Sequence, residues 1–156
     1  MAGIRGKNTR PEMMVRKALF ARGFRFRLHR KDLPGSPDLV MPGRKLAIFV
    51  NGCFWHWHGC QLSKMPASNT TFWKAKLAAN HERDLLAQLT LIGAGWRTVT
   101  IWECALRGRA AMDRLPQLMD QLAAWIRDQA EQPALEISGD GSTASSGLTS
   151  PVQEKT

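Results

Sequence analysis

Apolar and polar residues follow two different periods in the first part of the chain. Thr9-Arg10-Pro11-Glu12 combines an N-cap residue, a proline in the first helical turn and an acid three residues after the cap. Apolar residues then recur every three to four positions as far as Gly23, a typical helix-ending residue, so the pattern predicts a helix. Residues 24–28 alternate between apolar and basic side chains, which predicts a strand.

The middle of the chain predicts a hairpin and a long helix. Residues 37–41 and 45–50 flank the turn residues Pro42-Gly43-Arg44, and the second strand is apolar throughout, so we expect it to be central in a sheet. Residues 51–66 follow neither period and hold most of the unusual chemistry. A helix is expected over residues 70–91, before a break that contains two glycines.

The last part of the chain predicts two more elements and a tail. An apolar strand is expected over residues 96–102 and an amphipathic helix over residues 112–128. Large apolar residues are almost absent after Ile137, and Ser, Gly, Thr and Pro are frequent, so we expect residues 129–156 to be a disordered, low-complexity tail. The order of elements predicts a single α/β domain, residues 1–128, with a mixed central sheet flanked by helices.

Composition narrows the class of protein. A chain of 156 residues is long enough for one domain with a hydrophobic core. Its hydrophobic fraction of 44% and charged fraction of 22% are typical of soluble globular proteins, and no stretch has the roughly 20 apolar residues that span a bilayer. The basic N-terminus is not followed by the apolar core of a signal peptide. We therefore expect a cytosolic protein without a membrane segment.

The charge of the chain is distributed unevenly. The formal net charge is +9, but residues 1–128 hold 21 of the 22 Lys and Arg residues and nine of the 13 acids, a net charge of +12. Such a basic domain suits a polyanion, because each contact with a phosphate group releases condensed counterions. The charge by itself also fits a basic protein with no nucleic-acid role.

A run of eight residues concentrates thiols and imidazoles. The run is Cys53-Phe54-Trp55-His56-Trp57-His58-Gly59-Cys60, and Cys104 is the third and last cysteine of the chain. Zinc prefers four tetrahedral sulfur and nitrogen ligands, and an odd cysteine count argues against a disulfide framework. We therefore expect a closed zinc site of Cys53, His58, Cys60 and Cys104. The residues alone leave two alternatives open: His56 in place of His58, or a Cys104 that is simply buried.

A single carboxylate lies in the expected hairpin beside this run. Nucleases of the PD-(D/E)xK type carry an aspartate at the position of Asp38, and an acid with a lysine on the next strand, which together bind Mg²⁺ near the scissile phosphate. Here Ile48-Phe49-Val50-Asn51 occupies the place of the second acid and the lysine. The pair Pro37-Asp38 by itself is more typical of a turn or strand cap than of a nuclease.

Longer motifs carry a resemblance to a known family. The matching segments are residues 4–12, 33–38, 49–56, 82–84 and 102–108. Two strings are distinctive: Gly52-Cys53-Phe54-Trp55-His56 and Trp102-Glu103-Cys104-Ala105-Leu106-Arg107-Gly108. Taken together, these residues closely resemble the very short patch repair endonucleases, bacterial enzymes that act on T:G mismatches.

The resemblance implies a PD-(D/E)xK-like fold in which the second acid of the metal site is absent. Asp38 would bind Mg²⁺, and the backbone carbonyl of Val50 would replace the missing carboxylate. Glu12 would hydrogen-bond to water at the metal ion, and His56 would be the general base, a role that suits an imidazole near neutral pH. Asn51 stands where the family usually has histidine, and it carries neither a charge nor a transferable proton, so we expect a slower reaction.

The resemblance also implies zinc ligands and a DNA-binding wedge. Four residues match the family's structural zinc ligands: Cys53, His58, Cys60 and Cys104. This implies His58 rather than His56 as the ligand. Three aromatic residues match the wedge that enters the duplex beside the T:G pair: Phe54, Trp55 and Trp73. Unstacking costs least where pairing is already poor. We expect Phe72, by contrast, to serve in packing.

The resulting hypothesis is a Mg²⁺-dependent endonuclease that nicks duplex DNA 5′ to the thymine of a T:G mismatch and so starts very short patch repair. The resemblance implies a monomeric, cytoplasmic protein associated with the bacterial nucleoid, with functional links to a cytosine-5 DNA methyltransferase and mismatch-repair factors. The chain begins close to the family's core, so we expect it to lack most of an N-terminal arm that in some members reaches into the minor groove.

Two further functions fit the same residues. One is a zinc-stabilised PD-(D/E)xK nuclease that acts on intact DNA. The other is a non-catalytic, zinc-dependent DNA-binding module whose missing acid and lysine reflect lost catalysis. Nicking of matched and mismatched duplexes, with and without a chelator, separates the three hypotheses.

Overall fold

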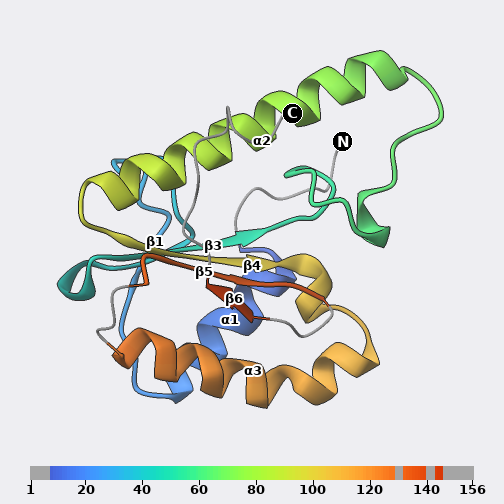
Figure 1. The fold of residues 1–156 in the computed structure, drawn as a ribbon. Helices are drawn as coiled ribbons and strands as arrows, with labels where there is room; N and C mark the ends of the chain where they lie inside the picture. The colour runs from blue at the N-terminus through green and yellow to red at the C-terminus, as the bar shows by residue number, and fades with distance from the viewer. Residues whose placement is uncertain (1–7, 129–131, 140–142, 146–156) are drawn as a thin grey trace.

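The computed structural model of the protein describes residues 8–128, 132–139 and 143–145 (Figure 1). A mixed sheet forms the middle of three layers, with helix α2 (Thr70–Gly93) across one face and helices α1 (Arg10–Ala21) and α3 (Arg109–Arg127) on the other (Figure 1). This confirms the expected α/β domain with a mixed central sheet flanked by helices.

The sheet has six strands, which pair in chain order. They are β1 (Arg27–Leu28), β2 (Leu39–Met41), β3 (Leu46–Asn51), β4 (Arg97–Trp102), β5 (Ala134–Ile137) and β6 (Thr143–Ser145). The β3–β4 and β4–β5 pairs are parallel, and the other three pairs are antiparallel. Short 3-10 turns follow β2 and β4, at Pro42–Arg44 and Glu103–Leu106, and a third, Gln61–Ser63, lies between β3 and α2.

Helix α1 begins where its sequence predicts. The hydroxyl of Thr9 accepts a hydrogen bond from the amide of Glu12 at 3.3 Å, which satisfies one free N–H group of the first turn. The strand expected over residues 24–28 is shorter than predicted, because Phe24 donates its amide to Leu19 at the end of the helix and buries its ring in the core. Only the last two of these residues join the sheet, as β1.

The expected hairpin is confirmed as β2 and β3. β3 pairs with β2 on one side and β4 on the other, so it is central, as its apolar sequence predicted. Its alternate residues face opposite layers: Leu46 and Ile48 join the core formed with α1 and α3, whereas Ala47 and Phe49 pack on the α2 side. The same alternation directs Asn51, at the end of β3, to the α2 side.

The two long helices differ in how much they bury. Helix α3 buries six residues, whereas the longer α2 buries only Leu77, Ala87 and Leu91. Helix α3 begins before its expected start at residue 112, because Gly108, with a φ of 91°, turns the chain directly into the helix. In the described residues no helix is both long and apolar enough to cross a membrane. Because α2 buries so few apolar side chains, polar side chains can lie between this helix and the sheet.

The structure corrects the expected end of the domain. The prediction placed the boundary after Asp128, but β5 pairs with β4, and Ala134, Leu135 and Ile137 are buried. The expectation of disorder from residue 129 is therefore wrong for this segment. β5 supplies backbone hydrogen bonds to β4, which would otherwise be an open edge of the sheet. The strand is short and flanked by polar residues, so its sequence does not indicate this pairing. Residues 129–131, 140–142 and 146–156 of the expected tail lie outside the described part.

Candidate active site and metal centre

A cavity of about 630 Å³ opens between the end of β3, the loop that follows it and helix α2. Its lining includes five of the predicted site residues: Asp38, Val50, Asn51, Trp55 and His56. Asp84 from α2 and Glu103 from the turn after β4 add two more acids to the wall. The structure thus brings the predicted residues together, although their chemical roles are still predictions.

Asp38 is held at the mouth of the β2–β3 hairpin. Its amide donates to the carbonyl of Ile48 at 3.0 Å, and its Oδ2 accepts a hydrogen bond from the amide of Val50 at 2.7 Å. Because the N–H and C=O of one strand residue point to the same edge, the carbonyl of Val50 also faces the Asp38 side. Burial raises the pKa of Asp38 to about 6, opposed by the hydrogen bond from Val50 and reinforced by the charge of Glu12.

Glu12 and His29 lie beside Asp38. Each of the three side chains offers one donor atom, and these atoms all lie within 4.8 Å of one another. Two carboxylates at this distance repel each other, and a cation between them removes that repulsion. Carboxylate and carbonyl oxygens are the hard ligands that Mg²⁺ prefers, so the donor set fits this ion. His29 was not predicted, although pairing residues 24–28 with the expected hairpin would have indicated it.

His56 lines the same cavity and is held from α2. Its Nδ1 is hydrogen-bonded to Oδ2 of Asp84, which leaves Nε2 as the nitrogen that can face a substrate or water. Asp84 belongs to a segment that resembles the family, but no role was assigned to it. Nothing in its spacing from His56 along the chain indicates the contact, because it depends on how α2 crosses the sheet.

The four predicted zinc ligands form a second cluster. One donor atom from each of Cys53, His58, Cys60 and Cys104 lies within 4.8 Å of the others. Sγ of Cys104 lies 3.5 Å from Nδ1 of His58, and the amide of Cys104 donates to Sγ of Cys53 at 3.4 Å. Burial raises the pKa of the Cys53 thiol, so its thiolate needs a cation beside it. Three thiols and one imidazole at these distances fit a tetrahedral zinc ion.

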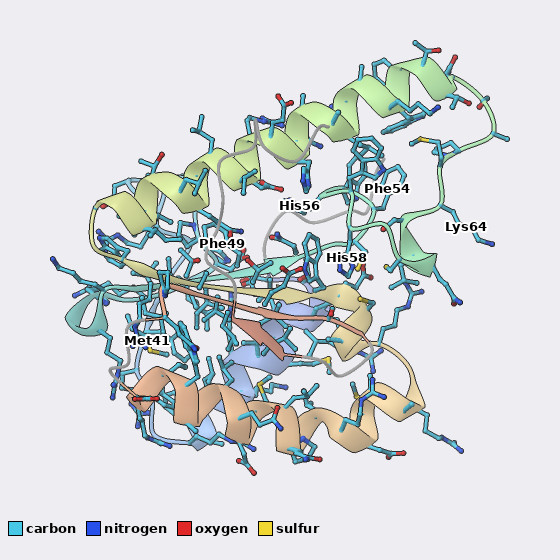
Figure 2. The ribbon with its side chains drawn as sticks, in the orientation of Figure 1. Met41, Phe49, Phe54, His56, His58 and Lys64 are labelled. Atoms are coloured by element: carbon cyan, nitrogen blue, oxygen red, sulfur yellow. The ribbon has the colours of Figure 1, made fainter. Side chains whose placement is uncertain are left out.

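The two imidazoles of the loop point to different places. Figure 2 shows His56 close to α2, whereas His58 lies beside the sulfur atoms near the end of β4. The geometry therefore brings His58, and not His56, to the cysteines. This arrangement agrees with the choice that the family resemblance implied and that the residues alone left open.

Residues of the expected tail support this Cys/His cluster. The ring of His58 stacks on Trp102, with centroids 4.1 Å apart and planes 7° from parallel. The indole Nε1 of Trp102 donates to Oε1 of Glu136, in β5, at 2.6 Å. A Cβ atom at Gly139 would lie 3.0 Å from Sγ of Cys104, so only glycine fits there. The sequence prediction missed these supports because it ended the domain at Asp128.

The three predicted wedge residues form one aromatic group. The ring centroids of Phe54 and Trp55 are 5.0 Å apart, and those of Phe54 and Trp73 are 5.5 Å apart, in edge-to-face geometry. All three are half-buried. Phe72, which we expected in packing, packs edge to face on Trp73 but is 58% exposed, so it lies outside the hydrophobic core. The expected absence of an N-terminal arm concerns residues 1–7, which lie outside the described part.

Comparisons with known proteins point to one family. Residues 1–62 match the family described as DNA mismatch endonuclease Vsr. The chain is 37% identical over 139 residues to the DNA mismatch endonuclease Vsr of Escherichia coli, which covers 89% of this chain and 88% of that protein. It is 48% identical over 121 residues to a type II nicking enzyme of Xanthomonas oryzae pv. oryzae, covering 77% of this chain and 89% of the relative. A type II nicking enzyme of Neisseria meningitidis is 40% identical over 123 residues, covering 78% and 88%.

Proposed function

Since this chain belongs to the Vsr family of DNA mismatch endonucleases, we propose that it nicks duplex DNA 5′ to the thymine of a T:G mismatch. The reaction is Mg²⁺-dependent hydrolysis of one phosphodiester bond, on a fold of the PD-(D/E)xK type, and it starts very short patch repair. The observation that carries the proposal is the single cavity lined by Asp38, Val50 and His56.

In this proposal Asp38 and the carbonyl of Val50 hold Mg²⁺, with Glu12 beside them. When bound, the ion neutralises charge on the scissile phosphate. Asn51 lines the same cavity, and its side-chain amide can donate a hydrogen bond to a phosphate oxygen but cannot transfer a proton. Asn51 would therefore orient the phosphate but could not perform any proton transfer by the histidine that the family usually has at this position.

His56 is the proposed general base. With Nδ1 engaged by Asp84, its Nε2 accepts a proton from the attacking water. The water oxygen forms the new bond to phosphorus while one ester P–O bond breaks, and the departing oxygen takes a proton from solvent. Asp84 keeps the ring oriented and balances the positive charge that the imidazole gains.

The Cys/His cluster and the aromatic group serve the same loop. We propose that Cys53, His58, Cys60 and Cys104 hold one zinc ion, which fixes residues 51–63 in place and thereby positions His56. Phe54 and Trp55 lie in this loop and pack with Trp73. These aromatic side chains would insert into the stack at the mismatch, where unstacking costs least.

The substrate also indicates the setting of the reaction. A T:G pair arises when a 5-methylcytosine is deaminated, so a cytosine-5 DNA methyltransferase and mismatch-repair factors are the proposed functional partners. The protein would act as a monomer on chromosomal DNA, in the cytoplasm at the bacterial nucleoid.

A nicking assay tests the proposal directly. Three labelled duplexes of one sequence carry T:G, T:A or C:G at the same position, and each is incubated with the protein in MgCl₂ or in EDTA. We expect a single nick on the thymine strand of the T:G duplex, in MgCl₂ only.

Each other outcome contradicts the proposal in a distinct way. Equal nicking of all three duplexes indicates a nuclease that acts on intact DNA. Binding without any nick, in MgCl₂ as well as in EDTA, indicates a non-catalytic DNA-binding module.

A further inference from the structure

The carboxylate of Glu12 is held by three donors that meet the same oxygen. Its Oε2 accepts from the amide of Asn8 at 3.3 Å, contacts Nε2 of His29 at 2.8 Å and forms an ion pair with the guanidinium of Arg16. Glu12 is only 2% exposed, so these contacts replace the solvation that it loses. With Oε2 engaged three times, Oε1 is the oxygen that remains available for a further contact.

His29 connects the two acids of the site. Its amide donates to the backbone carbonyl of Asp38 at 3.1 Å, while its ring contacts Glu12 on helix α1. Its φ of 51° lies in the left-handed region, which non-glycine residues adopt seldom and often at functional sites. The residue therefore ties the sheet edge that carries Asp38 to the helix that carries Glu12.

Two roles are open to the His29 imidazole, namely binding the metal ion or holding Glu12. Its Nε2 lies 3.3 Å from a guanidinium nitrogen of Arg16, in addition to its 2.8 Å contact with Glu12. A metal ion on this nitrogen would sit beside a permanent positive charge, which is unfavourable. A hydrogen bond to the carboxylate meets no such repulsion.

We propose that His29 and Arg16 are positioning residues that clamp Oε2 of Glu12 and so keep its Oε1 directed at the metal and water beside Asp38. The inference rests on the proposed function, since it concerns the same metal site. His29 acts through Glu12, so its loss loosens that carboxylate without removing a metal ligand.

The test compares His29→Ala with His29→Gln. The glutamine amide can donate to Oε2, whereas alanine cannot. Binding of Mn²⁺ to the DNA-free protein is measured by calorimetry, and the nicking rate of a T:G duplex is followed against MgCl₂ concentration. Asp120→Asn, which removes the charge of an exposed partner of Arg22 at the other end of α1 from Glu12, is the control.

For His29→Ala we expect Mn²⁺ affinity and the nicking rate to fall about 10- to 100-fold, the usual effect of losing a residue that orients a metal ligand. His29→Gln should recover to within about threefold of the parent protein, and the DNA dissociation constant, zinc content and melting temperature should stay unchanged. Arg16 is not substituted, because its loss would leave Glu12 buried without its main counter-charge.

Three results would overturn the proposal. If His29→Ala binds Mn²⁺ with the affinity of the parent protein, His29 does not position Glu12. Equal loss of Mn²⁺ binding in the Gln and Ala variants shows that His29 is itself a ligand. A drop in melting temperature that matches the loss of binding shows a purely structural role. If the parent binds Mn²⁺ but does not nick, the proposed function fails while the calorimetry still tests the clamp.

Discussion

The Cys/His cluster and the cavity that contains Asp38 and His56 are assembled in different ways. Three of the four cluster residues lie within eight positions of one another, and only Cys104 comes from a distant segment. The cavity draws its charged and amide side chains from before β2, from the end of β3 and the following loop, from α2 and from the turn after β4. The cluster can therefore hold a loop together, whereas the cavity depends on a framework that is already folded.

This difference predicts two kinds of failure. Removing a cluster residue should release the metal and destabilise the loop, and activity should fall as a consequence. Removing a cavity residue should abolish the reaction and leave the fold intact. Substitutions in the two regions therefore test whether metal binding and the reaction fail separately.

The largest expected effect is the loss of nicking activity when Asp38 is substituted. Asp38→Asn removes the negative ligand proposed for Mg²⁺, and a metal ion's charge stabilisation is worth several kcal/mol, so nicking should fall at least about 10³-fold. Zinc content, melting temperature and binding to a T:G duplex should match the parent protein. Asp32→Asn, at an exposed aspartate paired with Arg30, should nick at the parental rate. Parental nicking by Asp38→Asn in MgCl₂ would remove Asp38 from the site.

The next effect distinguishes two histidines of one loop. His58→Ala should lose zinc and destabilise the protein by more than about 4 kcal/mol, the range typical of losing a structural metal. For a chain of this size that is roughly 8–16 °C in melting temperature. His56→Ala should keep its zinc and its melting temperature yet lose nicking, since only His56 lines the cavity. Zinc analysis and thermal melts check both variants, and the reverse pattern would exchange the two assignments.

A smaller effect is expected on mismatch selectivity. Base–aromatic stacking contributes about 1–3 kcal/mol per base, so Phe54→Ala with Trp55→Ala should narrow the ratio of nicking on T:G over matched duplexes at least about tenfold. The two rings pack with Trp73, so a small loss of stability should accompany the change. Phe72→Ala, at an exposed ring that contacts the group through Trp73, is the matched control. An unchanged ratio in the double variant would direct the search for the wedge to Trp73.

The smallest effect concerns β5 and its support of the cluster. Glu136→Ala removes the acceptor of the Trp102 indole, and a net loss of about 1 kcal/mol lowers the melting temperature by roughly 2–4 °C. Zinc should also exchange faster with a chelator, because Trp102 no longer holds the His58 ring as firmly. Glu136→Gln keeps an acceptor oxygen and should behave more like the parent. Equal zinc exchange rates in the parent and both Glu136 variants would show that β5 does not stabilise the Cys/His cluster.

Much of the fold was predictable because its signals are local. The N-cap of α1 needs only Thr9 and Glu12, and the hairpin follows from turn residues between two apolar runs. The prediction was wrong where local signals were weak or misleading. Phe24 belongs to an alternating pattern but packs at a helix end, and β5 is a short strand among polar residues.

The residues that carry chemistry could be identified from the sequence alone, through the density of thiols and imidazoles, the single carboxylate of Asp38 in the expected hairpin, and the aromatic pairs. Their partners became known only from the folded domain. The contacts of His29 with Glu12, His56 with Asp84 and Trp102 with Glu136 join residues 17, 28 and 34 positions apart. Such contacts depend on strand register and on how a helix crosses the sheet. These features are set by the packing of the whole domain, because no residue's neighbours along the chain specify what lies opposite it in space.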